Sequence, residues 1–178
     1  MRTSSHVLVA YLVLLVVASV WRLLPLVPHA AAPDVGGLVA AYLGLTARGR
    51  IAPAVAGAVM VGYLADLLGG APTGLHAVVG GLVCILGHLV HRRILVRGLT
   101  MTLAFSAFVG AAAAVAVVII SELADRGLAL GSTGRSVLQI ALGTGAIGPT
   151  VFWLHRRVDA AFARTHRERD AALEGITS

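Results

Sequence analysis

The feature that most constrains this chain is a series of long apolar runs separated by short polar or basic breaks. A transmembrane helix needs about 20 predominantly apolar residues, because it must cross roughly 30 Å of hydrocarbon at about 1.5 Å per residue. Six runs approach that length: Val7–Leu24, Ala30–Ala47, Ile51–Leu68, Leu75–Val90, Leu99–Ser121 and Ser136–Leu154. The sequence therefore predicts an all-α polytopic membrane protein, a compact bundle of six transmembrane helices. The second span is short, with only 13 residues when it is counted from Val35.

The composition excludes a water-soluble globule. Hydrophobic residues make up 58% of the chain and charged residues 12%, whereas soluble domains contain about 45 to 50% apolar and about 25% charged residues. The chain has one cysteine, Cys84, so an internal disulfide and a thiolate metal cluster are excluded. The membrane environment is thus the first constraint on any function.

The arginines predict the orientation in the membrane. All 14 basic residues are Arg, and basic residues are concentrated in the cytoplasmic loops of membrane proteins. With six spans and a cytoplasmic N-terminus, three arginines lie outside (Arg22, Arg126 and Arg135). The other eleven lie inside: Arg2, Arg48, Arg50, Arg92, Arg93, Arg97, Arg156, Arg157, Arg164, Arg167 and Arg169. Both termini are therefore expected in the cytoplasm.

Two terminal regions have alternative readings. The first run could be a signal peptide with a small-residue site at Ala30–Ala32, but residues 21–29 hold an Arg and two prolines, so a retained span is expected. Residues 1–155 are predicted to form the transmembrane domain, and residues 156–178 a cytoplasmic, Arg-rich amphipathic tail. That tail is either a solvated charged helix or a helix resting on anionic headgroups.

The third run carries a carboxylate on a face of small residues. Ala54, Ala58, Gly62, Asp66 and Gly70 recur every four residues, so they share one face of a helix. Small residues at this spacing let helix backbones approach closely. Asp66 should therefore face protein, where it could cap the following turn, join a buried structural network, or bind an ion or substrate.

The turn after Asp66 is rich in residues that break helices. Gly69 and Gly70 are expected to end the third helix in a left-handed cap. Pro72 should stiffen the turn, and Gly74 should let the next helix start tightly. The two spans are thus predicted to form a close antiparallel hairpin.

The remaining polar residues do not form a recognisable catalytic or metal site. His76 and His88 lie at opposite ends of the fourth run, and Glu122 closes the fifth run as an interface residue. The spacing G-x-G-x-x-G at Gly143, Gly145 and Gly148 falls inside a span, which favours helix packing over nucleotide binding. We expect no enzyme activity, cofactor, metal or nucleic-acid partner.

The stretch from Pro33 to Gly98 combines a second hydrophobic segment that starts Pro-Asp, a short basic loop, and the run G-x-x-x-D-L-L-x-G-x-P-x-G-L-H-A. The residues of that run are Gly62, Asp66, Leu67, Leu68, Gly70, Pro72, Gly74, Leu75, His76 and Ala77. With these features the stretch resembles the bacterial rod shape-determining protein MreD family.

The resemblance implies a role in the bacterial cytoplasmic membrane. MreD-like proteins are multi-pass scaffolds of the cell-elongation machinery that builds the lateral peptidoglycan wall. The implied partner is an MreC-like bitopic protein, and the indirect partners are MreB filaments, RodA and a penicillin-binding protein. The same resemblance implies an architecture like that of the substrate-binding (S) subunits of energy-coupling-factor transporters. Such a subunit is the alternative function, and it would require a pocket for a vitamin or a metal.

Overall fold

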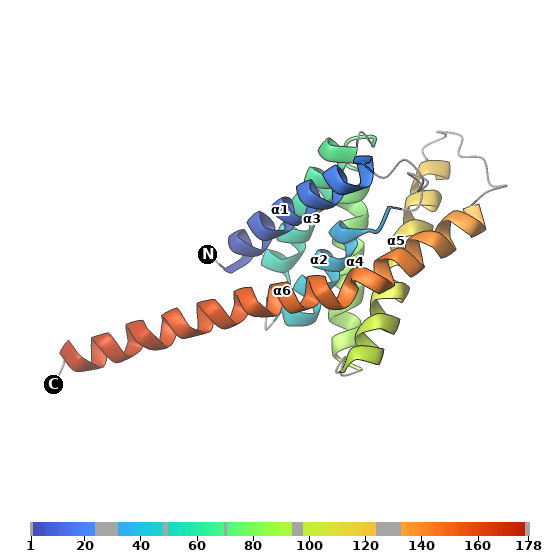
Figure 1. The fold of residues 1–178 in the computed structure, drawn as a ribbon. Coiled ribbons are helices and arrows are strands. Elements are labelled where there is room, and N and C mark those ends of the chain that lie inside the picture. The colour runs from blue at the N-terminus through green and yellow to red at the C-terminus, as the bar shows by residue number, and fades with distance from the viewer. Residues whose placement is uncertain are drawn as a thin grey trace.

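The computed structural model of the chain describes residues 2–23, 32–47, 50–69, 71–93, 98–123 and 133–176. Within these ranges the secondary structure is entirely helical, which confirms the predicted all-α fold. The helices are α1 (Arg2–Leu23), α2 (Val35–Thr46), α3 (Ala52–Gly69), α4 (Leu75–His91), α5 (Leu99–Leu123) and α6 (Thr133–Ile176) (Figure 1). Each predicted apolar run thus overlaps one helix, although α1 begins before its run and α6 extends far beyond its run.

The helices differ in their ability to cross a membrane. Four of them, α1, α3, α5 and α6, are long and apolar enough to do so. The apolar helices α2 and α4 are shorter, with 12 and 17 residues. At about 1.5 Å per residue α2 is only about 18 Å long, well short of a hydrocarbon core of roughly 30 Å. The expectation that the second segment is short is therefore confirmed.

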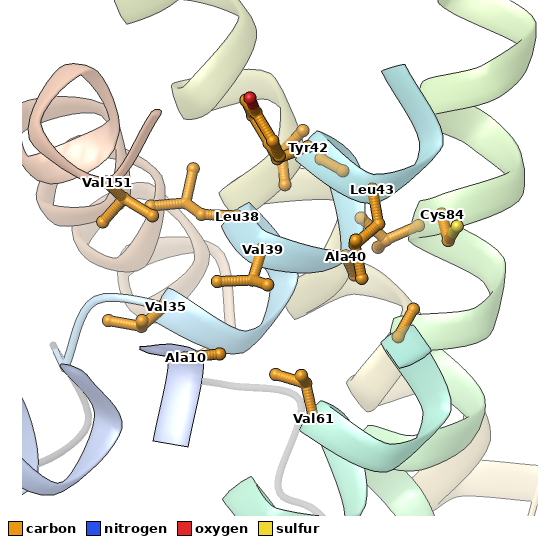
Figure 2. Packing of buried hydrophobic residues seen from close by; sticks show 14 of the residues in the cluster. Ala10, Val35, Leu38, Val39, Ala40, Tyr42, Leu43, Val61, Cys84 and Val151 are labelled. Atoms are coloured by element: carbon orange, nitrogen blue, oxygen red, sulfur yellow. The ribbon is translucent and has the colours of Figure 1, made fainter. Parts of the chain in front are cut away.

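Helix α2 lies at the centre of the bundle. Every residue from Val35 to Gly44 is buried, and its side chains meet those of α1, α3, α4 and α6 in one apolar cluster (Figure 2). Glycine makes this central position possible. A Cβ on Gly87 of α4 would lie 2.7 Å from the carbonyl oxygen of Ala41, so α2 and α4 are in backbone contact.

Helix α6 runs parallel to α2 and antiparallel to α5. The backbone N–H of Asp34 donates to Thr144 Oγ1, and the rings of Tyr42 and Phe152 pack edge to face. In both contacts the residue of α6 lies 110 positions after its partner at α2, so the two helices run in the same direction. On the other side of α6, a Cβ on Gly110 would lie 2.7 Å from Thr144 Cβ. Thr144 therefore lies between the start of α2 and the middle of α5.

Large apolar side chains also cover the outside of the bundle. On α1, Leu8, Leu12 and Val16 are 60%, 54% and 61% exposed and recur every four residues along one face. Equivalent exposed residues occur on α4 and α5, including Leu82 and Phe108. A protein in water would bury such rows, whereas lipid tails are as apolar as leucine. The exposed surface thus suits a membrane.

Helix α6 continues into the predicted tail. It runs without interruption for 44 residues, with Pro149 inside it, and its C-terminal half projects beyond the other helices (Figure 1). The predicted boundary after residue 155 therefore falls within a continuous helix, so the tail starts without a turn.

Candidate functional site

Asp66 closes the turn between α3 and α4. Its Oδ2 accepts a hydrogen bond from the backbone N–H of Gly74 at 2.9 Å, and its Oδ1 accepts one from the N–H of His76 at 3.1 Å. The ring of His76 also lies 2.7 Å from Oδ1 through Nδ1. The side chain of Asp66 is fully buried. Of the roles open to Asp66, capping this turn is the one that the geometry shows.

The small-residue face of α3 packs against α4, as predicted. A Cβ on Gly62 would clash with the carbonyl oxygen of His76 and would lie 2.8 Å from the Cα of Ala77. About one turn further along α4, a Cβ on Gly80 would lie 2.8 Å from the carbonyl oxygen of Ala58. Any larger residue at Gly62 or Gly80 would push the two backbones apart, so the predicted close hairpin is confirmed.

Among the described glycines of the turn, the predicted left-handed cap is absent at Gly69, and a left-handed residue occurs at Gly74. Gly69 is the last residue of α3, and its φ is not positive. Gly74 has φ 95° and is the N-cap of α4. The carbonyl of Pro72 accepts a hydrogen bond from the N–H of Leu75 at 3.1 Å, which tightens the start of α4. The left-handed backbone therefore lies just before α4, where glycine adopts it without steric cost and Asp66 binds the N–H of Gly74. Gly70 lies outside the described residues.

The other predicted site residues do not join Asp66. His88 lies twelve residues beyond His76 on α4, about 18 Å along the helix. Its Nδ1 is buried and has no hydrogen-bond partner among the described residues. Glu122 is exposed in the last turn of α5, as an interface residue would be. Gly145 and Gly148 pack against Ala107 and Ser106 of α5, which confirms the prediction of helix packing for this motif.

An apolar cavity of about 590 Å³ lies beside the Asp66 turn. Its walls come from the second half of α1, the start of α2, the end of α3, the first turn of α4, the second half of α5 and the start of α6. Most of the lining is aliphatic, for example Leu14, Val17, Ala65, Val117, Val137 and Ile140. The polar side chains among the described lining residues are Asp34, His76 and Ser136. This volume lies within the range of about 300 to 1,000 Å³ found for small-molecule sites.

Asp34 is the ionisable residue of this cavity that the sequence analysis did not single out. Its Oδ1 accepts a hydrogen bond from the N–H of Gly37 at 2.7 Å, so it is the N-cap of α2. An Asp immediately before an apolar run is a recognised signal for a helix start. Its position on the cavity wall carries no such signal, because the wall is built from five other segments of the chain.

A second buried polar group, which we call the His–Asp cluster, consists of His6, Tyr42, His155 and Asp159. The two rings meet through their Nδ1 atoms at 2.9 Å, and His6 Nε2 lies 3.0 Å from Asp159 Oδ1. The hydroxyl of Tyr42 donates to Asp159 Oδ2 at 2.7 Å. The cluster therefore joins α1, α2 and α6 at the opposite end of the bundle from the cavity.

The tautomers of the His–Asp cluster follow from these contacts. With Asp159 ionised and both rings neutral, the Nε2–H of His6 donates to Asp159, and the Nδ1–H of His155 donates to His6 Nδ1. Nε2 of His155 is then a buried acceptor, and it has no partner among the described residues. Because His6 and His155 are 149 residues apart, no spacing in the sequence could reveal the pair.

The Asp66 turn and the His–Asp cluster offer hydrogen-bonding groups, and the cavity offers an apolar space. Among the described residues, no group of three or more His, Cys, Asp or Glu side chains could hold a metal ion.

In comparisons with models of known protein families, with curated proteins and with solved structures, the chain matches none of them.

Proposed function

We propose that the chain is a membrane scaffold of the MreD kind, a subunit of the machinery that elongates a bacterial cell. The observation that carries this proposal is the Asp66 turn. The run of residues that resembles MreD forms a hairpin in which Asp66 binds the turn's own backbone and Gly62 holds the two helices in contact. A carboxylate engaged in this way serves the shape of the protein, which is what a scaffold requires.

The proposed topology has six crossings with both termini in the cytoplasm. The His–Asp cluster supports it, since His6 near the start of α1 contacts His155 and Asp159 of α6. The guanidinium of Arg157 also lies 4.9 Å from the ring centroid of Trp153, a pairing suited to the membrane–water interface. Residues 1–155 would then be the transmembrane domain, and residues 156–178 the cytoplasmic tail.

A scaffold also needs open helix surfaces. The exposed row on α1 and the exposed residues of α4 and α5 could contact either lipid or a single transmembrane helix. The MreC-like bitopic protein has one such helix, and through it the chain would connect with MreB filaments, RodA and a penicillin-binding protein.

The test is affinity capture of the tagged chain from its own host after crosslinking in living cells. We expect a bitopic protein with an extracytoplasmic coiled coil, together with cell-wall synthases. Depleting the chain should widen or round the cells. A second strain carrying Asp66→Asn tests the structural role of this carboxylate. Elongation should be largely retained, because the amide keeps the shape and part of the hydrogen bonding.

The alternative is the substrate-binding subunit of an energy-coupling-factor transporter. The apolar cavity favours it, since such a subunit needs a chamber, and two ionisable side chains, Asp34 and His76, line this one. The small-residue helix faces would then dock the coupling subunit of the transporter. The same capture experiment separates the two functions. Recovery of ABC ATPases and a coupling subunit, without the bitopic protein, would contradict the scaffold and support the transporter.

A further inference from the structure

The apolar cavity has polar groups that select the kind of head group it can bind. His76 donates from Nδ1 to Asp66, so in its neutral form the remaining ring nitrogen, Nε2, is a hydrogen-bond acceptor. About a third of this side chain is exposed, at 34%, and it lines the cavity. In that form the imidazole offers the cavity an acceptor and no donor.

Asp34 presents a second acceptor to the same cavity. One of its carboxylate oxygens, Oδ1, binds the N–H of Gly37. The other, Oδ2, makes no hydrogen bond with the described residues. Ser136, the third polar lining residue, already interacts with another residue of the chain. The cavity thus combines the carboxyl group of Asp34 and the imidazole of His76 with walls that are otherwise mostly aliphatic.

An anionic head group would find no counter-charge here. No arginine is among the described residues that line the cavity. Most of the backbone amides at the start of α2, which could attract an anion where they are free, already have partners, and that of Gly36 is the one without a partner among the described residues. The N–H of Asp34 binds Thr144, that of Val35 binds the carbonyl of Pro33, and that of Gly37 binds Asp34. Phosphate and carboxylate head groups are therefore disfavoured.

We infer that the cavity binds an amphiphile with an aliphatic body and a primary ammonium head, the head lying between Asp34 and His76. The ammonium supplies up to three N–H donors and a positive charge for these acceptors. The aliphatic body would pack against the aliphatic walls. The inference goes beyond the proposed function, because a scaffold does not require a ligand.

The test is competition binding on the purified full chain in detergent, with radiolabelled n-decylamine as the probe. Unlabelled n-decylamine, n-decanol and n-decanoate, which share a chain length and differ in the head group, are the competitors. We expect saturable binding that n-decylamine displaces at concentrations about tenfold or more below those needed for either of the others, the scale expected for a charge-assisted hydrogen bond.

Two pairs of matched variants locate the site. Asp34→Asn keeps an oxygen to cap α2 and removes the charge, so it should weaken n-decylamine binding about tenfold or more. Asp159→Asn makes the same change in the His–Asp cluster and should leave binding unchanged. Val117→Trp should fill the cavity and abolish binding. On the same helix, Val115→Trp changes a 44% exposed side chain outside the cavity lining and should not affect binding.

Several results would overturn the inference. Equal competition by n-decanol and n-decanoate would show a packing gap that accepts any aliphatic chain. Unchanged binding in Val117→Trp would place the amine elsewhere, and an absence of saturable binding would leave the cavity without this ligand class. Elution volume and melting temperature identify variants that have lost their fold, so that each comparison uses folded protein. Capture of the MreC-like partner is measured separately, so failure here leaves the proposed function standing.

Discussion

Replacing Gly62 with Ala should destabilise the bundle, because the new methyl group would meet backbone atoms. The Cβ would clash with the carbonyl oxygen of His76 and lie 2.8 Å from the Cα of Ala77. A backbone cannot turn aside as a flexible side chain can, so α3 and α4 must separate. Overpacking of this kind costs about 1 to 3 kcal/mol. Separation also stretches the hydrogen bonds of Asp66, which are worth about 1.5 to 3 kcal/mol when one partner is charged.

An opposing effect must be subtracted. Ala is favoured over Gly inside a helix by about 1 kcal/mol. Subtracting this preference from the overpacking cost and from the partial loss of the Asp66 hydrogen bonds leaves a net destabilisation of about 2 kcal/mol. For a chain of this length that amounts to a fall in melting temperature of roughly 4 to 8 °C. Both proteins would be heated at one scan rate in one detergent, with unfolding followed by circular dichroism.

Gly69→Ala is the matched control for this measurement. Gly69 lies on the same helix, and a Cβ there would meet nothing within 4 Å. The melting temperature of the Gly69→Ala protein should therefore equal that of the parent protein or lie slightly above it. If Gly62→Ala and Gly69→Ala melt at the same temperature, α3 and α4 do not depend on backbone contact at Gly62, and the reasoning is refuted.

Three further predictions concern the buried polar groups and the topology. Asp66→Asn loses part of the turn cap and should lower the free energy of unfolding by about 1.5 to 3 kcal/mol, and an unchanged unfolding curve would contradict the role of the turn. Tyr42→Phe removes the 2.7 Å hydrogen bond to Asp159 and should cost a similar amount in the same assay. For the topology, single cysteines replacing Arg50 or Arg92 should react with a membrane-impermeant maleimide only after the cells are opened. Labelling of intact cells at either position would contradict a cytoplasmic N-terminus. The native Cys84 is fully buried and should give no background.

The sequence determined the positions of the helices and the chemistry of one turn. The apolar runs located all six helices because the cost of unpaired backbone groups in hydrocarbon forces such runs to be helical. The spacing of Gly62 and Asp66 placed both on one helix face, and the Gly-Pro segment after them indicated a hairpin. These are local features, and they could be read without knowledge of which helices meet. The left-handed conformation of Gly74 was not predicted, since the choice among the glycines depends on where Asp66 finds its backbone partners.

Only the tertiary structure decided which helix is central and which residues share a site. Helices that are apolar on every side carry no periodic signal for an inner face, because lipid and protein interior are equally apolar. Burial of α2 therefore could not be read from its composition. The sequence also could not show that His6 meets His155, or that Asp34 and His76 line the same cavity, since contacts between distant segments depend on how the helices pack. Small residues set that packing, by fixing how closely each pair of backbones can approach.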